Sequence, residues 1–442
     1  MPVGRSSPEL LAQEMADKIR SRQARVGVVG LGYVGLPLAV EFAKAGFAVT
    51  GIDVSQAKTE RVNLGDSYVG DVPSDALAPL VESGKLRATT DFAVIAELDT
   101  VNICVPTPLR KTKDPDMSYI VSACEEIQKY FHPGMLVILE STTYPGTTDE
   151  LVLPMLSGSK YKVGEDFFLC FSPERVDPGN PVYQTTNIPK VVGGVTPACT
   201  EMGALFYSQA LQKVVPVRST QVAEMVKLLE NTFRLINIGL VNELALMCDR
   251  MGINVWEVID AAATKPFGFM PFYPGPGLGG HCIPIDPFYL SWKSKQAGIE
   301  ARFIELAGYI NGQMPHFVVD KVQNALNDSC KPLKGSHIHL LGVAYKRDID
   351  DVRESPALDI IHLLTRRGAK VTYSDPYVPS VRIEGREFFS GDALESSAAA
   401  DCVVIVTDHA AFDYPAIVEK ANLIFDSRHA LRGISSPKIV TL

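Results

Sequence analysis

The stretch ARVGVVGLGYVGLPLAVEFAKAGFAVTGIDVS, residues 24–55, decides the fold of this chain. It holds an apolar run, a G-x-G-x-x-G turn, a helical pattern and a second apolar run that ends at Asp53. Such a turn between a strand and a helix lets backbone N–H groups approach a pyrophosphate, and an acid about 20 residues later accepts the ribose hydroxyls. We therefore expect a dinucleotide-binding βαβ unit in which Asp53 repels a 2′-phosphate, so that NAD is favoured over NADP. The glycines of the turn are Gly30, Gly32 and Gly35.

Strand and helix patterns alternate on both sides of a helical centre. Apolar runs begin at Thr100, Gly134 and Phe167, and a second series begins with HIHLLGVAY at His337. Between these series, residues 219–250 form one long helical pattern without proline. We expect an α/β protein with two Rossmann-like parallel-sheet domains joined by a central helical domain with one long helix. The expected parts are an N-terminal helical extension (1–24), a dinucleotide-binding domain (25–217), a central helical domain with a glycine-rich loop (218–330) and a C-terminal α/β domain (331–442).

Composition excludes several classes of protein. The 442 residues carry a net charge of -9 with 46% hydrophobic residues and no dense basic stripe, so we expect no nucleic-acid partner. No apolar run approaches the roughly 18 residues that a membrane span needs, and we expect no membrane partner. The eight cysteines include no C-x-x-C pair, which argues against zinc sites and a disulfide framework and favours a cytoplasmic location. We interpret all of them except Cys282 as small buried apolar residues.

The densest chemistry lies in GGHCIPID, residues 279–286. Cys282 stands in a glycine-flanked loop that another molecule can approach. A thiolate in a dinucleotide-binding protein indicates oxidation of an aldehyde through a thiohemiacetal and a thioester. Lys227 and Asn231 share one face of the long helix, where they form either a solvated edge or a pair that holds an oxyanion. The same alternatives apply to SPER, residues 172–175, at a strand end.

Together these motifs resemble the UDP-glucose/GDP-mannose dehydrogenase family, whose members oxidise a primary alcohol of a nucleotide sugar to a carboxylate with NAD. The resemblance covers about residues 25–430. It implies that the domain at 25–217 binds NAD, that the loop in the central domain at 218–330 is catalytic, and that the domain at 331–442 binds the UDP-sugar. It rests on the Lys227 and Asn231 pair and on GLGYVG (30–35), ESTTYPGTT (140–148), SPERVDPG (172–179), GGHCIPID (279–286) and AYKRDIDDVRES (344–355).

The resemblance also implies roles for individual residues. Cys282 is then the nucleophile, Lys227 and Asn231 stabilise the oxyanions, and Asp286 with Thr142 positions a water close to Glu174. The implied cofactor contacts are Gly30, Gly32, Tyr33, Val34, Gly35, Asp53, Thr107, Thr142 and Arg353. The implied substrate contacts are Glu174, Arg175, Val176, Lys227, Asn231, Phe272, Tyr273, Gly275, Gly279, Tyr345 and Lys346. No metal is expected.

The form of SPER and of the run PFYPGPGLGGHCIPIDPFYL resembles the branch of the family that acts on UDP-N-acetylhexosamines. We expect UDP-N-acetylglucosamine as substrate, for surface polysaccharide precursor synthesis, with UDP-N-acetylmannosamine, UDP-N-acetylgalactosamine or UDP-glucose as alternatives. A β-hydroxyacid dehydrogenase and a non-catalytic nucleotide-sugar-binding protein are the competing interpretations, but neither needs Cys282. The apolar residues around the long helix predict a homodimer or a higher homo-oligomer.

Overall fold

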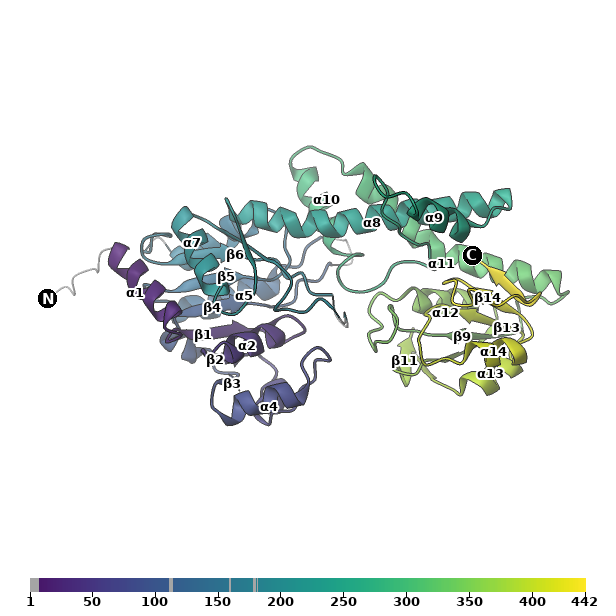
Figure 1. Cartoon of the computed structure of the whole chain (residues 1–442), viewed down its shortest axis with the longest axis horizontal. Coiled ribbons are helices and arrows are strands. Elements are labelled where there is room, and N and C mark those ends of the chain that lie inside the picture. Colours follow the sequence, from purple (N-terminus) through teal and green to yellow (C-terminus); the bar gives the residue numbers. More distant parts are fainter. Residues whose placement is uncertain (1–7, 111–113, 159, 178–179, 181) are drawn as a thin grey trace. The chain divides into compact units, whose positions relative to one another are not determined.

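The computed structural model describes residues 8–110, 114–158, 160–177, 180 and 182–442. The chain divides into two compact units, of which the first ends at Glu230 and the second begins at Asn231. The boundary lies within the long helix α8 (Thr220–Met251), at the place where the sequence predicts one long helix (Figure 1). The α/β class with two sheets and a helical centre is confirmed, whereas the predicted domain limits stay a prediction.

The first unit is built on an eight-stranded sheet with the order β3-β2-β1-β4-β5-β6-β7-β8. All neighbouring strands are parallel except β6 and β7, which the sequence pattern did not predict. Successive strands are added on one side of β1 up to β3 and on its other side from β4 onward, and ligands of such sheets bind at the carboxyl ends of the strands at this switch in strand order. The strands are β1 (Arg25–Val29), β2 (Ala48–Ile52), β3 (Leu86–Thr89), β4 (Thr100–Ile103), β5 (Leu136–Leu139), β6 (Phe168–Phe171), β7 (Lys190–Gly194) and β8 (Val214–Val217).

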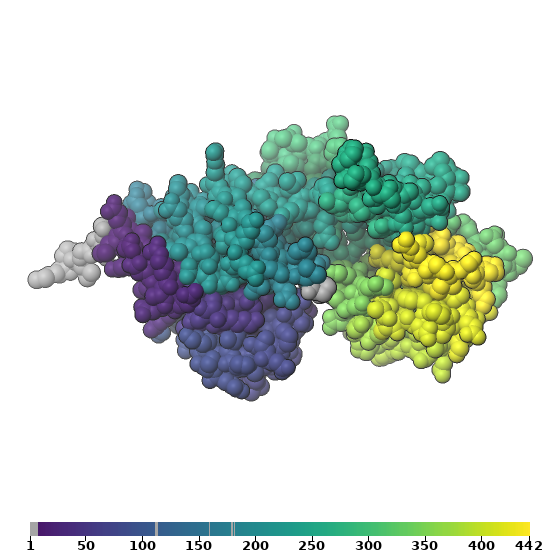
Figure 2. Space-filling view, viewed as in Figure 1, coloured from purple at the N-terminus to yellow at the C-terminus, as the bar shows by residue number. Residues whose placement is uncertain are grey.

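Helices cover this sheet, and its central strands are buried on both faces. Helix α1 packs on α7 through Met15 and Ile19, and the purple atoms of α1 lie directly against the first unit in Figure 2. The helical segments are α1 (Pro8–Arg20), α2 (Gly35–Lys44), α3 (Gln56–Asn63), α4 (Ser74–Glu82), η1 (Phe92–Glu97), α5 (Ser118–Lys129), η2 (Thr148–Val152), α6 (Leu153–Ser157) and α7 (Pro197–Tyr207).

The second unit joins a helical layer to a five-stranded parallel sheet with the order β10-β9-β13-β14-β15. A buried hydrogen bond from Asn242 to Asn311, 2.8 Å, fixes α8 to α11. The strands are β9 (His337–Leu341), β10 (Lys370–Ser374), β13 (Cys402–Ile405), β14 (Ile424–Asp426) and β15 (Ile439–Thr441), with a hairpin of β11 (Ser380–Ile383) and β12 (Arg386–Phe389). The helices are α9 (Val255–Ala263), α10 (Asp286–Gln296), α11 (Arg302–Asp328), α12 (Pro356–Arg366), α13 (Ala393–Ala399) and α14 (Tyr414–Lys420).

Two surface properties bear on the predictions from composition. Cys330 is exposed in the turn after α11, with a φ of 55°, so the interpretation of this cysteine as a buried apolar residue is wrong. The chain has to reverse beyond α11, and the turn keeps that side chain in solvent. Within the described residues, every helix is too short or too polar to cross a lipid bilayer.

Candidate active site

The glycine turn after β1 has the close packing that a dinucleotide site requires. Gly30 has a φ of 92°, and a Cβ there would lie 2.6 Å from the carbonyl oxygen of Cys104. A Cβ on Gly35, the first residue of α2, would lie 1.8 Å from the carbonyl oxygen of Gly30. The corresponding position on Gly32 has no atom within 4 Å, which leaves room for a phosphate. Packing therefore requires the outer glycines, and the middle one gives a ligand access to the turn.

Asp53 lies directly after β2 and is buried. Its carboxylate accepts hydrogen bonds from the N–H groups of Leu31 (2.8 Å) and Ser55 (2.9 Å). Each carboxylate oxygen can accept more than one bond, so Asp53 can also accept ribose hydroxyls. The Nζ of Lys58 lies 3.5 Å from Asp53 Oδ2, and this cation weakens the repulsion of a 2′-phosphate.

The other predicted cofactor residues of the first unit follow neighbouring strands. Thr107 is buried in the loop after β4, and Thr142 is half-buried in the loop after β5. Tyr33 is exposed, and Val34 precedes α2, whose N-terminus no side chain caps. These residues share the carboxyl edge of the sheet with the glycine turn, where the positive end of the α2 dipole favours an anion.

Glu174 lies three residues after the end of β6, among other buried charged side chains. The Nζ of Lys190 donates to Glu140 Oε2 (2.5 Å) and to Glu174 Oε2 (3.3 Å). Glu174 Oε1 also accepts the N–H groups of Arg175 (2.7 Å) and Val176 (2.8 Å). Burial acts to raise the pKa of Glu174, but the charge of Lys190, these N–H groups and the charge of nearby Lys227 outweigh it and lower the pKa.

Glu140 is the second buried carboxylate of this cluster and binds Lys190. Besides the bond from Lys190, it accepts hydrogen bonds from the hydroxyl of Tyr207 and from Asn102 Nδ2. Burial lowers the pKa of Lys190, but the two carboxylates reverse this effect and raise it above its ordinary value. The ammonium group is therefore held charged between Glu140 and Glu174.

Helix α8 contributes further charges from its first half. The Nζ of Lys227 donates to the carbonyl oxygen of Glu174 at 2.6 Å. The guanidinium of Arg175 forms two hydrogen bonds with the carboxylate of Glu230, at 2.6 and 3.2 Å. Glu224 accepts the N–H groups of Gly146 (2.6 Å) and Thr148 (3.0 Å), and burial raises its pKa to about 6. The loop that carries Thr142 and the segment that carries Glu174 are thus both fixed to α8.

The predicted nucleophile lies in the second unit, beside two other predicted residues. Cys282 is exposed, and its carbonyl oxygen accepts the N–H of Asp286 (2.8 Å), the first residue of α10. The buried carboxylate of Asp286 in turn accepts a hydrogen bond from Asn231 Nδ2 at 2.6 Å. The structure therefore places Cys282, Asp286 and Asn231 within one unit, and the roles that the resemblance implies for them stay predictions.

The glycine-rich loop before Cys282 packs against Tyr345. A Cβ on Gly279 would lie 2.5 Å from Tyr345 Cβ, and a Cβ on Gly280 would lie 2.8 Å from the ring. The N–H of Gly280 also donates to the carbonyl oxygen of Arg353 (2.9 Å), whose guanidinium is paired with Asp351 (2.7 Å). The loop carrying the nucleophile thus rests on the segment that begins with Tyr345 and Lys346.

The preceding part of this loop contains the remaining predicted substrate residues. Phe272 packs edge-on against Phe233 of α8, with ring centroids 5.7 Å apart. Tyr273 stacks on Trp256 of α9, and its hydroxyl donates to Asp260 at 2.9 Å. The N–H of Gly275 donates to the buried side chain of Asn242 at 2.9 Å. The loop is therefore held by α8 and α9 on its apolar side.

Sequence reasoning missed two charged residues. Lys190 begins β7, and only its three-dimensional contacts connect it to Glu174. Arg428 follows β14, and its Nη1 lies 2.8 Å from the position of a Cβ on Gly275. Burial lowers the pKa of Arg428 despite the charges of Asp408 and Asp426, and Arg428 Nε donates to the carbonyl oxygen of Val406. An arginine two residues after a buried strand was the available signal, because anions bind at this edge of a parallel sheet.

A Rossmann-type sheet with a complete dinucleotide turn, together with an exposed cysteine beside a buried carboxylate, defines an NAD-dependent oxidoreductase. Three family models match the chain: the NAD binding domain at residues 24–211, the central domain at 221–313 and the UDP binding domain at 339–433. The chain belongs to the UDP-glucose/GDP-mannose dehydrogenase family and is an NAD-dependent nucleotide-sugar dehydrogenase. The predicted family, enzyme class and cofactor are confirmed.

Individual relatives carry different substrate names. The chain is 35% identical over 393 residues to a UDP-N-acetyl-D-glucosamine 6-dehydrogenase of Pseudomonas aeruginosa, covering 88% of this chain and 92% of the relative. It is 36% identical over 402 residues to a UDP-N-acetyl-D-mannosamine dehydrogenase of Salmonella typhi, with 88% and 94% covered. The solved structure of a UDP-D-ManNAc dehydrogenase from Pyrococcus horikoshii matches with a TM-score of 0.87 and 32% identity, over 94% of this chain and 98% of that one.

Proposed function

We propose that this enzyme oxidises the C6 alcohol of UDP-N-acetylglucosamine to the uronic acid in two steps through a covalent intermediate on Cys282. The observation that carries the proposal is the exposed Cys282 joined to buried Asp286 and Asn231 in a chain of this family. The product is a uronic acid donor for surface polysaccharide synthesis. We expect the reaction in the cytoplasm, where the thiol stays reduced.

The residues divide the chemistry between them. The glycine turn and Asp53 would hold NAD, which when bound would supply the hydride acceptor for each of two oxidations. Cys282 Sγ adds to the aldehyde carbon while the carbonyl oxygen takes up a proton, which forms the C–S bond of a thiohemiacetal. The thiohemiacetal becomes a thioester when the second hydride and this hydroxyl proton leave. Water then breaks the C–S bond to give the acid and the free thiol, and Asp286 accepts the proton of that water. Because the sugar stays attached to Cys282, the aldehyde is not released.

The proposed oxyanion stabilisers are Lys227 and Asn231. Each offers donors from a buried position, the ammonium through Lys227 Nζ and the amide through Asn231 Nδ2. Donors that are fixed before the reaction stabilise developing negative charge without reorganisation. Glu174, ionised beside Lys190, and Thr142 assist the attacking water in this proposal.

The substrate assignment depends on the acetamido group. Met270 and Tyr273 are exposed, and Phe272 is held against α8, so this loop offers an apolar wall for the acetamido methyl. A site that pairs with the amide leaves buried polar groups unpaired when the sugar carries a plain 2-hydroxyl. Epimers at C2 or C4 retain the amide, so discrimination against UDP-N-acetylmannosamine and UDP-N-acetylgalactosamine is weaker.

We predict that UDP-glucose is used roughly 10²-fold less efficiently than UDP-N-acetylglucosamine, because its hydroxyl leaves the amide partners unmatched. The measurement is kcat/KM for a panel of UDP and GDP sugars with NAD, followed by NADH absorbance. Equal efficiency with both sugars contradicts the acetamido argument. A preference for UDP-N-acetylmannosamine moves the enzyme to the sister branch and leaves the Cys282 mechanism intact.

A second prediction concerns the choice of cofactor. NAD should be preferred over NADP because Asp53 repels a 2′-phosphate, and Lys58→Ala should sharpen this preference, because it removes the cation 3.5 Å from the carboxylate. The ratio of kcat/KM for the two cofactors is the readout. Lys129→Ala, which removes a lysine paired with Glu126 on α5, is the control and should leave the ratio unchanged. Comparable efficiency with NAD and NADP in the wild type shows that Asp53 is not at the ribose.

A third prediction concerns assembly. One side of α8 exposes a stripe of apolar side chains formed by Phe233 (45% exposed), Leu240 (59%), Met247 (49%) and Met251 (61%). We predict that a second copy of the chain covers this stripe, and that Leu240→Glu shifts the mass from dimer towards monomer because it buries a charge. Light scattering at micromolar concentration is the measurement. Leu64→Glu, at a position 81% exposed in the first unit, is the control. A monomeric wild type contradicts the prediction.

A further inference from the structure

The first strand of each parallel sheet is followed by a glycine turn, and the two turns share the same pattern of hydrogen bonds to an aspartate. In the first unit, Asp53 accepts the N–H of Leu31, the residue after Gly30. It also accepts the N–H of Ser55, which lies two residues after Asp53 itself. In the second unit, Asp375 follows β10 and accepts the N–H of Val343 (2.7 Å), the residue after Gly342, and of Tyr377 (2.9 Å). Gly30 and Gly342 have φ values of 92° and 81°. The second turn is therefore a nucleotide-type turn without the three-glycine pattern.

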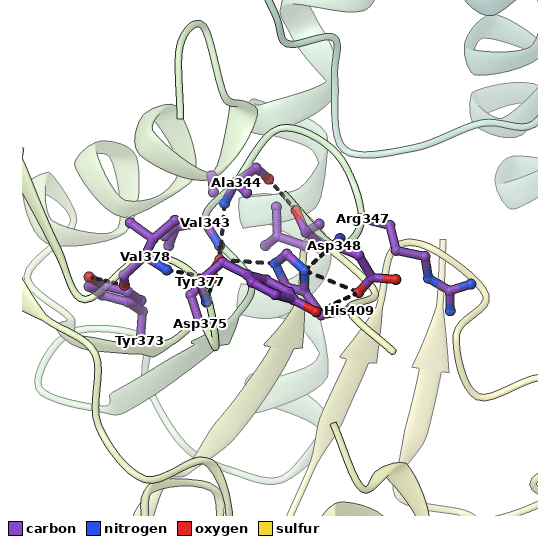
Figure 3. A network of polar contacts seen from close by, with 12 residues as sticks. Val343, Ala344, Arg347, Asp348, Tyr373, Asp375, Tyr377, Val378 and His409 are labelled. Atoms are coloured by element: carbon purple, nitrogen blue, oxygen red, sulfur yellow. Dashed lines mark hydrogen bonds and ion pairs between the residues drawn. The ribbon is translucent and has the colours of Figure 1, made fainter. Parts of the chain in front are cut away.

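The two aspartates differ in what else they bind. Asp375 also accepts the N–H groups of Ala344 and Val378 (both 3.1 Å) and a hydrogen bond from His409 Nε2 (3.0 Å) (Figure 3). His409 Nδ1 accepts the N–H of Asp348 at 2.9 Å and also lies 3.8 Å from Asp348 Oδ1, so His409 connects Asp348 to Asp375. Burial raises the pKa of Asp375, but the bond from His409 and the backbone N–H groups outweigh it and lower the pKa. In the proposed function, the remaining acceptor sites of the Asp53 carboxylate bind a ribose. The corresponding acceptor sites of the Asp375 carboxylate already accept hydrogen bonds from the protein.

These contacts fix both ends of a loop, residues 343–348. At its start, Ala344 is held through its N–H by Asp375 and through its carbonyl oxygen by Thr407 Oγ1 (2.6 Å). At its end, Asp348 is held by His409 and by the N–H of Ala410 (2.8 Å). Asp348 has a φ of 59°, a conformation that costs energy in a residue with a side chain and needs such support. Tyr345 and Lys346 lie between the two fixed ends.

We infer that His409 takes the place of a nucleotide ribose at the turn of the second sheet and is thereby the positioning residue for the loop that carries Tyr345 and Lys346. This inference rests on the proposed function, in which these two residues contact the UDP end of the substrate. In this inference, the turn after β9 holds His409 in place of a dinucleotide, and the loop of residues 343–348 contacts UDP. Because Gly279 and Gly280 pack on Tyr345, loss of this support also disturbs the loop that carries Cys282.

The test compares His409→Ala with the wild type in the full-length enzyme. We expect KM for the UDP-sugar and the Kd of UDP, measured by calorimetry, to rise about tenfold or more, with the KM of NAD unchanged. Imidazole added to His409→Ala should restore part of the UDP affinity, since it can refill the site between Asp375 and Asp348. Thr407→Val removes only the bond to the carbonyl of Ala344 and should raise the Kd of UDP less; it carries the test if His409→Ala does not fold.

Two further variants separate the possible outcomes. His339→Ala removes another buried histidine, whose bonds go to the hydroxyls of Thr372 and Ser374 and not to residues 343–348, and it should lower stability without changing the Kd of UDP. Lys346→Ala tests the loop assignment itself: an unchanged Kd refutes the proposed UDP contact rather than the role of His409. A raised Kd in Lys346→Ala with an unchanged Kd in both His409→Ala and Thr407→Val overturns the inference.

Discussion

Replacing Cys282 by alanine should abolish formation of the uronic acid, with a loss on the order of 10³-fold or more in kcat. Without the thiol, neither the thiohemiacetal nor the thioester can form, so the second oxidation has no covalent intermediate. Binding of UDP and NAD should persist, because alanine retains the carbonyl oxygen that accepts the N–H groups of Ile285 and Asp286 and so keeps the loop conformation. The measurement combines NADH formation with calorimetric titration of both ligands.

The matched control for this variant is Cys330→Ala, which removes the other exposed cysteine and should leave the rate unchanged. Cys282→Ser is informative in a different way, because an alkoxide can attack the aldehyde but leaves less readily, so an ester-like adduct can accumulate. Such an adduct would be visible by mass spectrometry. Full oxidation to the acid by the Cys282→Ala variant would contradict the covalent mechanism.

Replacing Lys190 by methionine should have the second-largest effect, because it leaves Glu140 and Glu174 facing each other without their shared cation. Breaking a buried ion pair by removing one partner typically costs about 3–5 kcal/mol of folding stability. The exposed pair of Lys162 and Glu165 offers the control, and Lys162→Met should cost no more than about 1 kcal/mol. Chemical denaturation of both variants is the measurement. Equal stability of the two shows that the buried cluster contributes nothing.

The same variant should change the pH dependence of the reaction. In the wild type the lowered pKa of Glu174 keeps it ionised, and its stabilising contribution is present above about pH 4.3 and is lost as the pH falls through the lowered value. Without Lys190, the pKa of Glu174 rises, so the acidic limb of the kcat profile moves to higher pH. Lys190→Arg retains the charge and should restore part of the profile. An unmoved acidic limb contradicts the role of Lys190.

The sequence predicted the parts of the fold that depend on local spacing. The turn at Gly30 and the acid at Asp53 lie 23 residues apart in one βαβ unit, and α8 has an uninterrupted helical pattern, so both could be predicted. The antiparallel pairing of β6 with β7 was not predicted, because the residues of a strand do not encode the direction of its neighbour. The exposure of Cys330 likewise depends on how the chain turns after α11.

The candidate site divides in the same way. Cys282 and Asp286 were predicted because they stand in one short motif, and the structure adds the hydrogen bond from Asn231. Lys190 was missed because its two carboxylates lie 50 and 16 residues away, a separation that no motif spans. His409 was missed for a similar reason, since its partner Asp375 lies 34 residues before it.

The number of NADH molecules formed for each sugar consumed tests the central claim most directly. The wild-type enzyme is supplied with limiting UDP-N-acetylglucosamine and excess NAD, and the reaction is followed to completion by absorbance. Because one thiol holds the sugar through both oxidations, we predict two NADH per sugar and the uronic acid as the only product. One NADH per sugar, with the aldehyde recovered in solution, would contradict the account.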